Sequence, residues 1–203
     1  AISGVITDGG KFKWDTEKYP GMKDFKKFGP FAYTAKLRNG LFRNTGACLS
    51  PQNAFYNSIG METLGLRMER VCDNAKTLAQ FFATEYSDIE VNYPGLAGSK
   101  WHNIATEQFG DKFGGIITIR TGNKKRAFGI IDALKLPLIV SNIGDTKTLV
   151  IHPESTLNVH STQEEKETAG VFDDLIRISV GIEDIDDLID DFKQAIESVK
   201  DVY

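Results

Sequence analysis

An arginine inside a short apolar run is the residue of this sequence that most suggests chemistry. Arg177 lies within Leu175–Val180, in the stretch "DDLIRISVGIED". Side chains alternate along a strand, so Arg177 shares one face with Leu175 and Ser179, while the isoleucines beside it share the other face. The guanidinium is always charged, and its rigid fork of N–H groups matches a carboxylate or phosphate. The pattern predicts a strand with its isoleucine face on the core and its arginine face toward a cleft that binds an anion.

Two simpler interpretations of Arg177 stay open from the pattern alone. On an edge strand, the side chain would reach past apolar neighbours to water. A neighbouring acid, Asp173 or Asp174, would instead form a structural ion pair with it. The other feature without an obvious packing role is the bend "SNIG" at Ser141–Gly144.

The remaining candidate groups favour structural roles. The acid run "EDIDDLIDD" places Asp184, Asp187 and Asp191 at helical spacing, which predicts a solvated helix face rather than a metal site. No metal-ligand or CxxC spacing occurs, so we expect no metal site and no disulfide from the histidines and cysteines, which are His102, His152, His160, Cys48 and Cys72. The sequence also contains no nucleophile elbow, Walker loop or dinucleotide fingerprint.

An α/β or α+β scaffold is expected to position these residues. Apolar and β-branched runs predict strands at Ile2–Thr7, in "IEVNYPG", "GGIITIRTG", "LPLIVSNIG" and "KTLVIHP", and at 175–180. Helical periodicity predicts a long helix from 51, capped by Ser50, to about residue 85, a second helix in "NKKRAFGIIDALK" and a last one after Asp184. The lysine- and aromatic-rich segment 11–30 favours a solvated loop over a nucleic-acid platform. The order indicates a small sheet covered by helices.

The composition is that of an ordinary globular protein. The 203 residues are 41% hydrophobic and 26% charged, which is sufficient for a sizeable core. A net charge of -4 with interspersed signs argues against nucleic acid as a partner, and no apolar run approaches the roughly 20 residues of a membrane span. Two unbridged thiols suit a reducing compartment, so we expect a cytoplasmic protein.

Four stretches together resemble the Cys/Met-metabolism family of pyridoxal-phosphate (PLP) enzymes. They are "DDLIRISVGIEDIDDLIDDF", "SNIGDTKTLVIHP", "RNTGACLSPQNAFYNSIGMETLGLRMER" and "NYPGL". Within the family, "SNIGDTKTL" is most similar to the O-acetylhomoserine sulfhydrylase branch, because the lyases and synthases tend to carry a shorter "SLG" form. The resemblance extends over essentially the whole chain and matches the C-terminal half of family members.

This resemblance implies the C-terminal portion of a fold type I PLP-dependent transferase. Residues 1–60 would end the large PLP-binding domain and begin the linking helix, and residues 61–203 would form the small C-terminal domain. The lysine that forms the Schiff base with PLP, together with most PLP-binding residues, would lie upstream of Ala1. We therefore assign no catalytic or cofactor-binding residue in this chain and expect it to be inactive alone.

The resemblance also implies a substrate site. It matches Arg177 to the arginine that grips the α-carboxylate of the amino-acid substrate, and it matches Asn142, with Ser141 beside it, to the bend that assists. The family motif "P-A-S-T-T-H" is altered here: Leu157 and Asn158 replace its second threonine and its histidine. The hydroxyl that often supports the arginine is thus missing.

For the intact protein, the resemblance implies γ-replacement in a cytoplasmic homotetramer. Acetate leaves O-acetylhomoserine, and sulfide or methanethiol takes its place to give homocysteine or methionine, with PLP as the cofactor. Three alternatives stay open: a cystathionine γ-synthase or γ-lyase of the same family, a non-catalytic amino-acid-binding α+β module, and an interaction domain.

Overall fold

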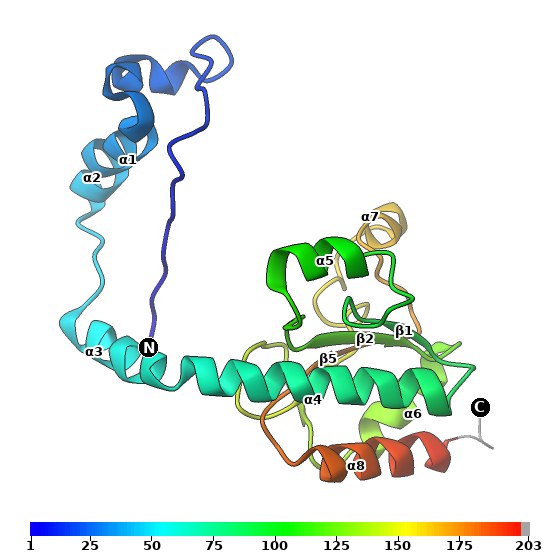
Figure 1. Ribbon diagram of the computed structural model, residues 1–203. Coiled ribbons are helices and arrows are strands. Elements are labelled where there is room, and N and C mark those ends of the chain that lie inside the picture. Colours follow the sequence, from blue (N-terminus) through cyan, green and yellow to red (C-terminus); the bar gives the residue numbers. More distant parts are fainter. Residues whose placement is uncertain (200–203) are drawn as a thin grey trace. The chain divides into compact units, whose positions relative to one another are not determined.

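The computed structural model of this protein describes residues 1–199. The chain divides into two compact units, Ala1–Thr63 and Leu64–Tyr203, and each is described by itself. The first unit contains short helices, and the second contains the sheet and the helices that cover it (Figure 1). The assignment of residues 1–60 and 61–203 to two domains of a larger enzyme stays a prediction.

The first unit is built from short helical segments: η1 Pro20–Phe31, α1 Ala32–Leu37, η2 Arg38–Phe42, α2 Arg43–Thr45 and α3 Pro51–Glu62. The strand predicted at Ile2–Thr7 is wrong, because these residues form no strand. All five strands of the described chain lie between Glu90 and Ser179 and pair with one another. The β-branched run therefore has no partner strand in the described part of the chain with which to form a ladder of hydrogen bonds.

The segment 11–30 was predicted as a solvated loop, but η1 occupies its second half and aromatic rings pack together in its first half. The ring of Trp14 stacks on Tyr33 with the centroids 5.8 Å apart and meets Tyr19 edge-on at 5.5 Å. Met22, in η1, is buried. Aromatic pairs of this kind stabilise a fold by more than the area they bury. The contacts of Trp14 with Tyr19 and Tyr33 therefore help to order this lysine-rich segment.

The long helix predicted from residue 51 to about residue 85 consists of two helices. The hydroxyl of Ser50 accepts from the backbone N–H of Asn53 at 3.2 Å, which confirms the predicted N-cap of α3. Thr63, at φ -108°, ends α3, and α4 Leu64–Glu85 follows. The apolar period continues across this position, and periodicity alone does not reveal a one-residue interruption.

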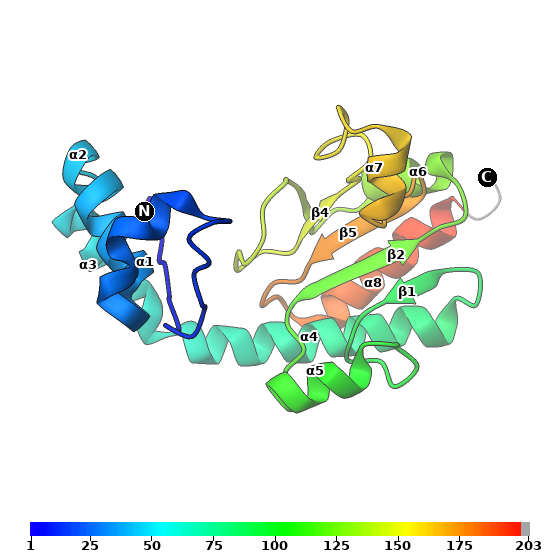
Figure 2. The same cartoon turned by 90° about the horizontal axis from the view of Figure 1, so that it is seen from above.

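Five strands form one sheet in the second unit, in the order β1-β2-β5-β4-β3, and Figure 2 shows β1, β2, β5 and β4 side by side in this order. They are β1 Glu90–Asn92, β2 Ile116–Arg120, β3 Leu138–Ile139, β4 Leu149–Ile151 and β5 Leu175–Ser179. The β3–β4 pair is parallel and the other pairs are antiparallel. Each strand occurs where the sequence predicted one. The strand with the arginine is in the centre of the sheet, so the edge-strand interpretation of Arg177 is wrong.

Three helices cover one face of this sheet: α4, α6 Lys124–Ala133 and α8 Ile185–Ser198 (Figure 1). The isoleucine faces of β2 and β5 pack against them in a core that includes Ile117, Ile119, Ile176, Ile178, Leu78, Phe82, Ile130, Leu188 and Phe192. On the other side lie α5 His102–Phe109 and α7 Gln163–Thr168, which the sequence analysis did not predict. Among residues 1–199, no helix is both long and apolar enough to cross a bilayer.

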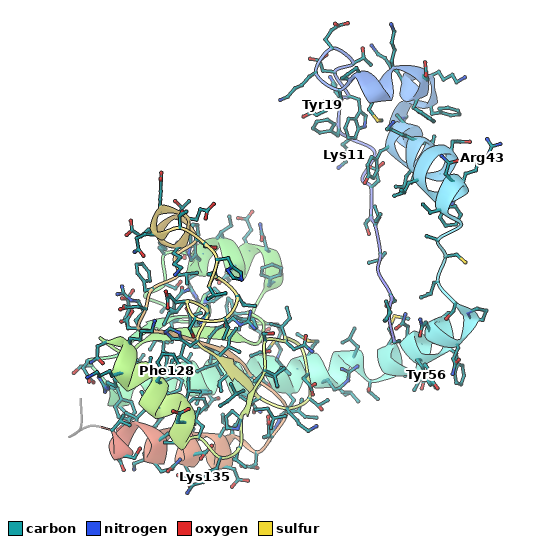
Figure 3. All side chains as sticks on the ribbon, turned by 180° about the vertical axis from the view of Figure 1, so that it is seen from behind. Lys11, Tyr19, Arg43, Tyr56, Phe128 and Lys135 are labelled. Carbon is teal, nitrogen blue, oxygen red and sulfur yellow. The ribbon has the colours of Figure 1, made fainter. Side chains whose placement is uncertain are left out.

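The last helix corrects one prediction about the acid run. Asp184 is the N-cap of α8 and accepts from the N–H of Asp186. Asp191, however, is buried and does not lie on a solvated face. Its carboxylate accepts from the N–H groups of Lys135 and Leu136, both at 2.9 Å; Figure 3 labels Lys135 close to α8. A buried carboxylate is tolerated when hydrogen bonds replace its water, and here a loop distant in sequence supplies them.

Candidate functional site

Arg177 lies in the middle of β5, with β2 on one side and β4 on the other. Its register partners are Thr118 on β2 and Ile151 on β4. The flanking isoleucines of β5 are buried in the helix-covered core, so Arg177 belongs to the opposite face, as predicted. We call this face, which carries Thr118, Arg177 and Ser179, the open face of the sheet.

The guanidinium of Arg177 is partly buried and incompletely hydrogen-bonded. Its Nη2 donates to the backbone carbonyl of Asn142 at 3.1 Å. Its Nε is buried and has no hydrogen-bond partner among the described residues. Burial lowers the pKa of Arg177, because removing water disfavours the charged form. A buried N–H without a partner costs free energy, and the hydrogen bonds of this guanidinium are incomplete among the described residues.

A second arginine on the open face, Arg120 of β2, has different surroundings. Its Nε donates to Asp174 at 3.0 Å, and its Nη1 lies 3.6 Å from Glu90. Its guanidinium also lies over the ring of Phe172, 3.9 Å from the centroid. Asp174 therefore pairs with Arg120, and neither Asp173 nor Asp174 forms an ion pair with Arg177 within residues 1–199. The structural ion pair considered for Arg177 is thus wrong.

The bend predicted at Ser141–Gly144 lies in the loop between β3 and β4. The structure brings Asn142 of this bend into contact with Arg177 through its backbone carbonyl. Ser141 is exposed at the start of the bend. The N–H of Gly144 donates to the hydroxyl of Ser179 at 3.2 Å. Sequence reasoning missed this contact, although the i, i+2 spacing of Arg177 and Ser179 already placed both on one face.

Thr156 belongs to the altered motif after β4, and within residues 1–199 it forms no hydrogen bond with Arg177. The hydroxyl of Thr156 donates to the carbonyl of His152 at 2.7 Å. Leu157, which replaces a family threonine, is exposed. His152 is buried, with its Nδ1 2.9 Å from the hydroxyl of Ser155. The hydrogen bonds among His152, Ser155 and Thr156 therefore stabilise the turn that follows β4.

The other histidines and the cysteines form no recognisable site. The ring of His102 stacks on Phe113 with the centroids 5.4 Å apart, and its Nδ1 lies 2.9 Å from the carbonyl of Pro94. Cys48 is exposed, Cys72 is buried, and neither forms a disulfide. Residues 1–199 contain no group of three or more side chains placed to hold a metal ion.

Two cavities lie beside this site. One, of about 210 Å³, is lined by Ile143, Gly144 and Ser179 among others. The other, of about 900 Å³, lies over β1 and β2 and is lined partly by Thr118 and Arg120. Because both carboxylates near Arg120 occupy its guanidinium, the larger cavity offers a weaker site for an anion than Arg177 does.

Comparison with known proteins places these features in a family context. A model of the family described as Cys/Met metabolism PLP-dependent enzyme matches residues 1–197. The O-acetyl-L-homoserine sulfhydrylase of Corynebacterium glutamicum is 38% identical over 98% of this chain and 49% of its own length. The chain spans about half the length of the curated relatives it matches.

Solved structures show the same relationship. The O-acetylhomoserine sulfhydrylase of Wolinella succinogenes is 36% identical with a TM-score of 0.69, over 85% of this chain and 46% of that one. A Campylobacter jejuni protein solved with N'-pyridoxyl-lysine-5'-monophosphate is 40% identical with a TM-score of 0.75, over 80% of this chain and 39% of that one. The expected fold class, a mixed α/β structure whose small sheet is covered by helices, is confirmed.

Proposed function

Because this chain belongs to the family of Cys/Met metabolism PLP-dependent enzymes, we propose that it is the C-terminal part of an O-acetylhomoserine sulfhydrylase. The intact enzyme replaces the acetate of O-acetylhomoserine by sulfide or methanethiol and gives homocysteine or methionine. Relatives of that name support the branch, as does the stretch "SNIGDTKTL".

The observation that carries this proposal is the incomplete hydrogen bonding of Arg177. The Asn142 carbonyl accepts from Nη2 of the guanidinium, and the Nε has no hydrogen-bond partner among residues 1–199. A carboxylate with two oxygens can accept from two N–H groups of one guanidinium in a fixed geometry. In the proposed role, Arg177 grips the α-carboxylate of the substrate and thereby orients the bond from Cα to hydrogen for the reaction.

The donors at this site fit the substrate carboxylate. A single guanidinium matches a carboxylate or a phosphate, but the phosphate of a cofactor is usually cradled by several backbone N–H groups, whereas β5 contributes a side chain. The family resemblance is the reason that we assign PLP to residues outside this site. When bound, PLP supplies an electron sink for the charge that proton removal leaves on the substrate.

Three further features belong to the same proposal. The lysine that holds PLP lies outside residues 1–203, so this chain by itself does not catalyse the reaction. The intact enzyme is a cytoplasmic homotetramer, as family resemblance implies. Its second substrate is sulfide or a small thiol.

Kinetics of the intact enzyme test the role of Arg177. We expect Arg177→Ala to raise the KM for O-acetylhomoserine about 10- to 100-fold, the value of charge-assisted hydrogen bonds to a carboxylate. Bound PLP, measured from its absorbance, should be unchanged. The methyl ester of O-acetylhomoserine, which has no carboxylate charge, should be turned over equally by both enzymes.

A matched variant separates this role from the general effect of an arginine on the open face. Arg120→Ala removes the neighbouring guanidinium, whose partners are Asp174 and Glu90, and should leave the KM within about twofold while lowering stability. An unchanged KM in Arg177→Ala, or an equal rise in both variants, would contradict the proposal.

The position of the PLP lysine is tested on the 203-residue chain itself. We expect that PLP followed by borohydride reduction produces no stoichiometric pyridoxyl adduct at a single lysine. Intact mass and peptide mapping measure this. A stoichiometric adduct at one lysine of this chain would show that the lysine is here after all.

A further inference from the structure

The loop that contacts Arg177 is tied to β5 at a second point. Two residues along the strand from Arg177, Ser179 presents its hydroxyl to the backbone N–H of Gly144, at 3.2 Å. Ser179 is only 2% exposed. Residues two apart on a strand lie roughly 7 Å apart on the same face, so Arg177 and Ser179 hold neighbouring positions of one loop.

Two residues of this loop contact β5 through backbone atoms, Asn142 and Gly144. Gly144 has φ 74°, a left-handed backbone conformation that residues other than glycine rarely adopt. Asn142 comes two residues earlier, and its carbonyl accepts from Nη2 of Arg177 at 3.1 Å. Fixing the Gly144 amide therefore restricts where the Asn142 carbonyl lies.

The base of the loop is anchored separately, at the turn that follows β5. The N–H of Ile182 donates to the carbonyl of Thr146 at 2.9 Å, and the hydroxyl of Thr148 donates to Glu183 at 2.9 Å. At Gly181 an added Cβ would collide with the Thr146 carbonyl, so glycine allows this close approach. These contacts hold the loop at Thr146 and Thr148. Nearer to Asn142, the loop is held by the hydrogen bond from Gly144 to the Ser179 hydroxyl.

We propose that Ser179 is a positioning residue for the carboxylate site, acting through Gly144 and Asn142 on Arg177. Its hydroxyl fixes the Gly144 amide, and the fixed loop presents the Asn142 carbonyl to Nη2. This holds the guanidinium in one orientation, with its remaining N–H groups available to a substrate carboxylate. The inference rests on the proposed function of Arg177, and it adds a residue that never touches the substrate.

The test compares three variants in the intact enzyme. Ser179→Ala removes the acceptor and should raise the KM for O-acetylhomoserine about fivefold, the value of one neutral hydrogen bond, with little change in kcat. Ser179→Thr keeps the hydroxyl, and the added methyl can enter the cavity of about 210 Å³ that Ser179 lines; its KM should return to within about twofold of the original. Thr121→Val is the control.

Thr121 is a suitable control because its buried hydroxyl is far from Ser179 along the sheet. Ser179 pairs with Ile116 at the start of β2, whereas Thr121 directly follows the end of β2. It is 1% exposed and donates to the carbonyl of Asp174. Thr121→Val should lower stability about as much as Ser179→Ala does and leave the KM unchanged. A second readout, amide hydrogen exchange at Gly144, should become about fivefold faster in Ser179→Ala only.

The outcomes separate the two proposals. If Arg177→Ala raises the KM and Ser179→Ala does not, the positioning role is overturned while the carboxylate site stands. Equal KM increases in Ser179→Ala and Thr121→Val would also overturn it, because general destabilisation would explain both. If Arg177→Ala leaves the KM unchanged, the proposed function fails, and faster exchange at Gly144 would then describe only a structural contact.

Discussion

The two faces of β5 differ in how completely their side chains are satisfied. Ile176 and Ile178 are 0% exposed and lie in the core beneath the helices. Arg177, between them in sequence, is on the open face with a buried Nε that has no partner among the described residues. A ligand can add no contact to close-packed apolar side chains, whereas it can supply the acceptor that an unpartnered N–H lacks. One strand thus provides stability on one face and a candidate recognition site on the other.

Truncating the covered face should have the largest effect. Ile178→Ala removes a fully buried side chain and should lower the free energy of unfolding by about 2–5 kcal/mol, because a cavity remains among the helices. Arg177→Ala, one position away, should change it by less than about 1 kcal/mol. Urea unfolding measures both. Equal losses at the two positions would mean that both faces contribute equally to stability.

A polar residue among the covering helices should have an intermediate effect. Asp191→Asn keeps the shape but replaces one of the carboxylate oxygens that accept from Lys135, Leu136 and Gln194. We expect a loss of about 1–3 kcal/mol in the free energy of unfolding, because a backbone N–H then faces an NH₂ group.

Asp190→Asn is the matched control for this prediction, since Asp190 is exposed on the same helix and lies beyond its first turn, where the helix dipole acts. It should change the free energy of unfolding by less than about 0.5 kcal/mol. Similar losses in the two variants would argue against a special role for the buried carboxylate.

The smallest effect is expected on the side of the open face, at α7. This helix buries no residue, and an ion pair of Glu154 with Lys124 and Lys166 ties the α7 segment to α6. The hydrogen bonds from Lys124 and Lys166 hold the pKa of Glu154 at about 2, below its usual value of about 4.3. The stabilisation is therefore fully present above about pH 4.3 and is lost as the pH falls toward 2.

A pH series of urea unfolding measures this contribution. Glu154→Gln should be less stable than the original protein by about 1 kcal/mol at neutral pH, because the ion pair is partly exposed to water. The difference should shrink between pH 4.3 and 2. A difference that stays constant across this range would exclude the ion pair as its source.

Much of this molecule follows from local patterns in the sequence. The alternation in "LIRISV" predicted which residues of β5 face the core, and the period of Leu188, Phe192 and Ile196 predicted the buried stripe of α8. The capping box of α7, Thr162 with Glu165, was also present as a T-x-x-E signal, although the helix was not predicted. Such patterns depend only on neighbours along the chain.

Two of the wrong predictions share one cause, which is their dependence on groups elsewhere in the chain. The run Ile2–Thr7 has the composition of a strand but pairs with no strand within residues 1–199. Asp191 has the spacing of a solvated acid but is buried because the loop after α6 brings two N–H groups to it. Neither outcome is encoded within a few residues of the position itself.

The sequence by itself determined that Arg177 would stand on a strand face opposite a row of isoleucines, because side chains alternate along any strand. Only the tertiary structure decided which acceptors reach it. The β3–β4 loop brings the Asn142 carbonyl across 35 positions of the chain, while Asp174, three residues away, turns to Arg120. Hydrogen bonds need atoms within about 3 Å, and folding sets that distance independently of separation in sequence.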